Sequence, residues 1–142
     1  MIGIFDSGVG GLSVWQRLKQ ELPGASTMYL ADSAFAPYGE KSAAQIVERS
    51  KQVVRTLVEH GAKMVVVACN TATVNAIEEL REEFPDTPIV GIEPAIKPAA
   101  QASEAIIVLG TNSTVSNPRY HALIDEYAPA HQIWNIGAPE LV

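Results

Sequence analysis

Residues 64–77 read M-V-V-V-A-C-N-T-A-T-V-N-A-I, and this stretch contains the only cysteine of the chain, Cys69. An apolar run ends in a small residue, the cysteine, an amide and two hydroxyls, and a helix-like pattern follows. This pattern predicts a buried strand that carries Cys69 at its C-terminal end, followed by a helix that Asn70 or Thr71 caps. In open α/β sheets the chemistry lies at the carboxyl ends of strands, so Cys69 is placed where a site is expected.

Cys69 is a candidate reactive thiol. The N-terminus of a helix and nearby polar hydrogens favour the thiolate, which is the reactive form of cysteine. The alternative is a buried structural cysteine, because free cysteine is among the most buried residue types. The polar neighbours Asn70, Thr71 and Thr73 favour the reactive interpretation, since an inert core thiol needs no polar surroundings.

Apolar runs and amphipathic segments alternate along the chain. The expected strands are Ile2–Phe5, Thr27–Ala31, Ala62–Cys69, Pro88–Ile92, Ala105–Gly110 and Gln132–Ile136. The expected helices are Leu12–Leu22, Ser42–His60, Thr71–Phe84, Ala95–Ala102 and Pro118–Tyr127. Such alternation predicts an α/β fold, a three-layer sandwich with a mostly parallel sheet.

A change of character at Glu93–Ser103 indicates a hinge between two lobes. We expect a first α/β lobe at residues 1–95, which carries the Cys69 half-site, and the beginning of a second, similar lobe at residues 96–142. The pattern does not determine the strand order. The hydrophobic core is expected to include Ile4, Val65, Val67, Val90 and Ile107.

The composition excludes several classes of protein. Hydrophobic residues make up 47% of the chain and charged residues 18%, which is typical of a globular domain. The net charge is −6 and Lys and Arg do not cluster, so no nucleic-acid partner is expected. No apolar run reaches the ~18 residues of a membrane helix, and the N-terminus lacks a signal-peptide pattern. A single cysteine suits a reducing compartment, so a cytoplasmic protein is expected.

Three more polar segments follow expected strands. The first, Asp6–Gly11, has three glycines that let the backbone approach a ligand, although it fits no nucleotide-binding motif. In isolation, Asp6 or Ser7 is also explained as a helix cap. The second, Pro37–Gly39, is on its own typical of an ordinary turn. The third, Thr111–Thr114, offers hydroxyls and amide hydrogens to a carboxylate, although on its own it is typical of a polar helix entry.

Taken together, these segments resemble the glutamate racemases of the aspartate/glutamate racemase superfamily. The resemblance covers the whole chain and rests on motifs in the family's order: I-G-I-F-D-S-G-V-G-G-L-S-V (2–14), A-D-S-A-F-A-P-Y-G-E-K-S (31–42), V-V-A-C-N-T-A-T (66–73), G-I-E-P-A-I-K-P-A (91–99) and T-N-S-T-V (111–115). It implies that Cys69 is the first catalytic cysteine and that Asp6 is the aspartate beside it. The substrate-binding positions that it implies are Ser7, Pro37, Tyr38, Gly39, Asn70, Thr71 and Thr114. It also implies that glutamate is the substrate, that peptidoglycan precursor synthesis uses the product, and that neither a cofactor nor a metal takes part.

Racemising an amino acid without a cofactor requires a proton-transferring group on each face of the Cα atom. The family supplies its second cysteine from a later half, and these 142 residues contain no second cysteine. The chain therefore resembles the front half of a racemase, and we expect it to be inactive alone. Two alternatives stay open: a non-catalytic truncated domain with a residual carboxylate-binding half-site, and a one-cysteine, decarboxylase-like relative. Uncovered sheet edge and apolar surface predict a homodimer or poor solubility.

Overall fold

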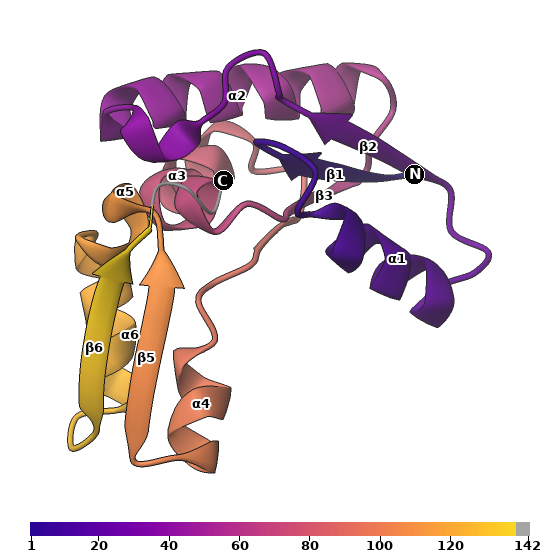
Figure 1. Ribbon diagram of the computed structural model, residues 1–142. Helices are drawn as coiled ribbons and strands as arrows, with labels where there is room; N and C mark the ends of the chain where they lie inside the picture. The colour runs from indigo at the N-terminus through magenta and orange to yellow at the C-terminus, as the bar shows by residue number, and fades with distance from the viewer. Residues whose placement is uncertain (139–142) are drawn as a thin grey trace.

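The computed structural model describes residues 1–138 and contains two parallel β-sheets (Figure 1). The first sheet has the strand order β2-β1-β3-β4, and the second pairs β5 with β6. The strands are β1 (Ile2–Asp6), β2 (Thr27–Ala31), β3 (Met64–Val67), β4 (Ile89–Gly91), β5 (Ala105–Gly110) and β6 (Gln132–Gly137). The predicted α/β class with parallel strands is confirmed.

Helices alternate with the strands as predicted. They are α1 (Leu12–Glu21), the 3-10 helix η1 (Tyr38–Glu40), α2 (Ala43–Glu59), α3 (Asn70–Glu83), α4 (Ile96–Ala102), α5 (Asn112–Val115) and α6 (Pro118–Tyr127). The sequence pattern does not predict η1 or α5, because a single turn is too short to show a helical period. Within residues 1–138, no helix combines the length and the apolar character that a membrane span requires.

The first sheet lies between helices. Figure 1 shows α2 on one side of this sheet and α1 on the other, which gives the predicted three layers. Alternate residues of a strand point to opposite faces, so Phe5, Val65 and Val67 share the face that α2 and α3 cover. The buried cluster on that face also includes Ile46, Val53, Val54 and Leu57 of α2 and Ala72, Ala76, Ile77 and Leu80 of α3. This packing fixes β1 and β3, whose carboxyl ends carry the first half of the candidate site.

The second sheet is covered on one face. Its buried cluster contains Ile96 of α4, Ile106 of β5, Tyr120 of α6 and Ala128, with partly buried neighbours from the same helices. Figure 1 shows α4 and α6 beside these strands. The lobe boundary near residue 95 stays a prediction, and residues 139–142 of the expected second lobe lie outside the described residues.

The predicted core is partly wrong. Ile4, Val65 and Val67 are fully buried as expected, but Val90 is 43% and Ile107 is 65% exposed. The reason is strand parity: the buried neighbours Ile89 and Ile106 face the helices, so Val90 and Ile107 point to the opposite faces. An apolar run shows that a strand is present but does not tell which faces of the sheet are covered.

The uncovered face of the second sheet is expected to drive self-association. Four large apolar side chains are exposed on β5 and β6: Ile107, Leu109, Trp134 and Ile136. Contiguous exposed apolar surface promotes association. Sedimentation velocity should therefore show a mass that rises with protein concentration, and an Ile107→Thr/Ile136→Thr variant should shift the population toward monomer. A wild-type chain that remains monomeric at high concentration would contradict this prediction.

Candidate functional site

A cavity of about 790 Å³ opens where the strands of the two sheets end. β1 ends at Asp6, and its neighbour β3 is followed by Cys69, while β5 ends at Gly110 and leads into Thr111. Every residue predicted for the site lines this cavity: Asp6, Ser7, Pro37, Tyr38, Gly39, Cys69, Asn70, Thr71 and Thr114. The fold brings the predicted residues together, and their individual roles stay predictions.

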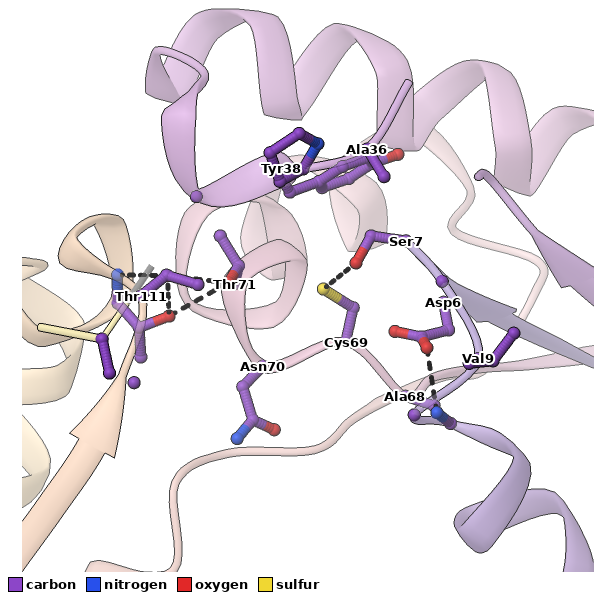
Figure 2. Close-up of a pocket in the computed structure, with 18 of the residues that line it drawn as sticks. Asp6, Ser7, Val9, Ala36, Tyr38, Ala68, Cys69, Asn70, Thr71 and Thr111 are labelled. Carbon is purple, nitrogen blue, oxygen red and sulfur yellow. Dashed lines mark hydrogen bonds between the residues drawn. The ribbon is translucent and has the colours of Figure 1, made fainter. Parts of the chain in front are cut away.

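Cys69 is itself the N-cap of α3. Its backbone is extended, with φ −87° and ψ 118°, and its Sγ accepts a hydrogen bond from the backbone N–H of Ala72 at 3.4 Å. The prediction that Asn70 or Thr71 caps this helix is wrong, because both residues already lie in its first turn. The Ser7 hydroxyl lies 3.3 Å from the same sulfur (Figure 2). Two polar groups therefore hold the thiol at the cavity wall.

Burial has the largest effect on the pKa of Cys69. The residue is only 6% exposed, and this burial raises the pKa of its thiol. The hydrogen bonds from Ser7 and from the Ala72 N–H lower the pKa, while the negative charge of Asp6 raises it. Desolvation is the largest of these effects, because a thiolate loses more from leaving water than two hydrogen bonds return. The hydrogen bonds at the helix N-terminus thus favour the thiolate, as expected from the sequence, but the effect of burial on the pKa is larger.

Alkylation of Cys69 is expected to require a higher pH than alkylation of a free cysteine. Only the thiolate attacks iodoacetamide, so a raised pKa moves the rate profile upward. Ser7→Ala removes a hydrogen bond that lowers this pKa and should move the midpoint higher still. Alkylation rates measured by mass spectrometry over a pH series give the midpoint of the rate profile for wild type and for Ser7→Ala. A wild-type midpoint at or below that of free cysteine would contradict the prediction.

Asp6 contacts the glycine-rich turn rather than the sulfur. Its Oδ2 accepts a hydrogen bond from the backbone N–H of Gly11 at 2.9 Å and another from the Tyr29 hydroxyl at 3.4 Å. Burial and the Asp6 carboxylate raise the pKa of Tyr29 to about 12, so its hydroxyl stays protonated at neutral pH. The influence of Asp6 on Cys69 is thus electrostatic, whereas Ser7 makes the direct contact.

Three buried hydroxyls connect the two halves of the cavity wall. The Oγ1 atom of Thr71 in α3 lies 3.0 Å from that of Thr111 and 3.1 Å from that of Thr114. The Thr111 and Thr114 hydroxyls are 3.0 Å apart, and Thr111 caps α5 through the backbone N–H of Thr114. Thr111 belongs to the polar segment that the sequence offers to a carboxylate, but the resemblance implies only Thr114 as a substrate-binding position. The sequence signal for Thr111 is a threonine three residues ahead of Thr114 at a helix start.

Pro37, Tyr38 and Gly39 form another part of the wall. The Tyr38 hydroxyl donates a hydrogen bond to Asp32 at 2.8 Å, and Asp32 forms an ion pair with Arg49 of α2. Sequence reasoning missed both Asp32 and Arg49. Their contact spans 17 positions and leaves no local pattern that a sequence could reveal.

The cavity offers proton transfer and hydrogen bonding. Cys69 supplies a thiol and Asp6 a carboxyl group, and no Lys, Arg or His of residues 1–138 lines the wall. A bound carboxylate would therefore be held by hydroxyl and amide hydrogens rather than by a cationic side chain. The described residues also contain no group of three His, Cys, Asp or Glu side chains that could hold a metal ion. This arrangement is suited to acid–base chemistry on a small polar molecule.

Comparison with known families finds a match over nearly the whole chain. Residues 2–138 match the family model described as Asp/Glu/Hydantoin racemase. The glutamate racemase of Pseudomonas aeruginosa is 48% identical over 143 aligned residues, which cover 99% of this chain and 54% of that relative. The chain thus spans about half the length of the curated relatives that it matches.

Solved structures give the same result. The Escherichia coli glutamate racemase in complex with L-glutamate and the activator UDP-MurNAc-ala has a TM-score of 0.92 and 43% identity, covering 99% of this chain and 53% of that one. The Francisella tularensis glutamate racemase in complex with D-glutamate has a TM-score of 0.83 and 29% identity, covering 94% of this chain and 51% of that one.

Proposed function

Because this chain belongs to the Asp/Glu/Hydantoin racemase family, we propose that it is the Cys69 half of a glutamate racemase. Such an isomerase interconverts L- and D-glutamate, here without a cofactor, and supplies D-glutamate for peptidoglycan precursors in the cytoplasm. One observation carries the proposal: the Cys69 sulfur, held by Ser7 and the Ala72 N–H, lines a cavity together with hydroxyl, amide and carboxyl side chains.

Cys69 transfers the proton on one face of the substrate. Its thiolate removes the hydrogen from Cα, the C–H electron pair moves toward the α-carboxylate, and the thiol returns a proton to the same atom. Hydrogen-bond donors stabilise the charge that develops on the carboxylate. Asn70, Thr71 and Thr114 are suited to this task because their amide and hydroxyl side chains belong to residues that line the same cavity as Cys69.

Inversion requires a second acid on the opposite face of Cα. Cys69 is the single cysteine among the 142 residues. We therefore propose that a polypeptide of these residues alone binds glutamate but does not racemise it. The alternatives are a domain that binds a carboxylate without chemistry, and a one-cysteine decarboxylase-like relative, which needs protonation on one face only.

Titration of the chain with L- and D-glutamate, followed by two-dimensional NMR, tests the binding step. Backbone amides of Asn70 and Thr71 should shift with either enantiomer, and Thr114→Val should weaken both titrations because it removes a hydroxyl from the wall. Succinate serves as a ligand control that lacks the amino group. The absence of any shift with both enantiomers would contradict the proposed substrate for this polypeptide, and carbon dioxide release would favour the decarboxylase alternative.

A further inference from the structure

A buried carboxylate lies behind the cavity wall and takes no part in the proposed chemistry. Asp32 follows β2, is 4% exposed and does not line the cavity. Its Oδ2 accepts hydrogen bonds from the Tyr38 hydroxyl at 2.8 Å and from Nε of Arg49 at 2.7 Å. Its Oδ1 accepts a hydrogen bond from Nη2 of Arg49 at 2.5 Å. This paired geometry is the strong, directional form of an arginine–carboxylate contact.

Asp32 is connected to the candidate site through its backbone and through its side chain. Its backbone N–H donates to the carbonyl of Asp6 at 2.8 Å, which ties the start of the loop to the end of β1. Its side chain holds Tyr38, whose ring is 1% exposed and lies 6.1 Å from that of Phe5 and 5.9 Å from that of Phe35. Figure 2 shows Tyr38 across the cavity from Cys69.

Tyr38 serves as a fixed donor in this arrangement. Burial, followed by the hydrogen bond to Asp32, raises its pKa, so the hydroxyl remains protonated. The hydrogen bond to Asp32 likewise raises the pKa of Arg49, which remains a cation. Tyr38 and Arg49 therefore keep their protons at neutral pH, and the bidentate contact between Arg49 and Asp32 sets the position of the tyrosine.

We propose that Asp32, fixed by Arg49, is a positioning residue that sets the Pro37–Gly39 wall of the candidate site through the Tyr38 hydroxyl. The ligand in this inference is that of the proposed function, a dicarboxylic amino acid. A shift of the Pro37–Gly39 wall would also affect the three buried threonine hydroxyls, since Gly39 packs directly against Thr111. Loosening Asp32 should therefore alter the wall without touching Cys69.

Substitution of Arg49 tests the inference from outside the cavity. Arg49→Met keeps an unbranched but shorter side chain and removes its donors, and Arg49→Lys keeps the charge but loses the bidentate contact. The matched control is Arg55→Met, because Arg55 lies on the same helix and pairs with Glu83 at the surface, away from the loop. Tyr38→Phe provides a second variant that removes a single hydroxyl.

Two measurements separate the positioning role from the proposed substrate. The dissociation constant for glutamate, measured well below each melting temperature, should rise about tenfold in Arg49→Met, less in Arg49→Lys and not in Arg55→Met. Without ligand, hydrogen exchange at the amides of Phe35 and Lys41, which bond to loop carbonyls, should accelerate about tenfold in Arg49→Met and Tyr38→Phe. Exchange in α2 outside its first turn should not change.

Each outcome bears on one statement. If wild type binds no glutamate but loop exchange responds as expected, the substrate is wrong and the positioning role stands. If Arg49→Met and Tyr38→Phe match Arg55→Met in both measurements, the positioning role is overturned. If Arg49→Met does not fold, Arg49→Lys and Tyr38→Phe decide the question by the same two measurements.

Discussion

A polypeptide of residues 1–142 is expected to exchange the Cα hydrogen of glutamate with solvent while leaving its configuration unchanged. Cys69 is the single thiol of the sequence, so a proton that it removes returns to the same face. Inversion needs a group within hydrogen-bond reach of the opposite face. Asp6 is the one carboxyl group among the described residues that line the cavity; it accepts hydrogen bonds from Gly11 and Tyr29 and lies beside Cys69 in Figure 2.

Incubation with each enantiomer in D2O measures both reactions. Mass spectrometry detects deuterium at Cα, and circular dichroism detects inversion. Exchange should accelerate as the pH rises, because burial raises the pKa of Cys69, and Cys69→Ala should abolish it. Cys69-dependent inversion at about 1 per second or faster would overturn the prediction and would imply a second base from another chain. An equal rate of Cα hydrogen exchange in Cys69→Ala and wild type would show that the thiol is not the base.

The local pattern of the sequence is sufficient to predict the strands and the longer helices of the fold, though not the single turns η1 and α5. Long stretches such as Ser42–His60 show a helical period over several turns, and apolar runs such as Ala105–Gly110 are bounded by turn residues. The structure has helix α2 at Ala43–Glu59 and strand β5 at Ala105–Gly110. The same patterns could not give the strand order, which depends on contacts between segments distant in sequence.

The sequence predicts a position in the candidate site for a residue that ends a strand, as Asp6 ends β1, or that closely follows one, as Cys69 follows β3, which ends at Val67 rather than at Cys69 as predicted. Three properties were not predictable. The parity of Val90 and Ile107 depends on which face of a sheet is covered, the protonation of Cys69 depends on burial, and the Asp32–Arg49 contact depends on tertiary packing. All three are set by the assembled structure, and no neighbouring residue in the sequence encodes them.

A single methyl group at Gly39 is expected to disrupt the cavity wall. A Cβ atom there would lie 2.7 Å from Cβ and 2.8 Å from Cγ2 of Thr111, closer than such atoms approach in real structures. Thr111 cannot move freely, because its hydroxyl contacts those of Thr71 and Thr114. The backbone of Gly39 is not in the left-handed region, so the effect of alanine is purely steric.

We expect Gly39→Ala to lower the free energy of unfolding by about 1–3 kcal/mol and to weaken glutamate binding, because η1 and α5 must separate to admit the methyl group. Urea unfolding measures the first effect and NMR titration the second. Gly24→Ala is the matched control, since a Cβ at Gly24 meets no atom within 4 Å. Adding Thr111→Ser removes the Cγ2 contact and should restore part of the stability, which makes the two substitutions non-additive. If Gly39→Ala has the same free energy of unfolding and the same affinity for glutamate as Gly24→Ala, the prediction is wrong. The wall would then accommodate the methyl group without loss of stability or binding.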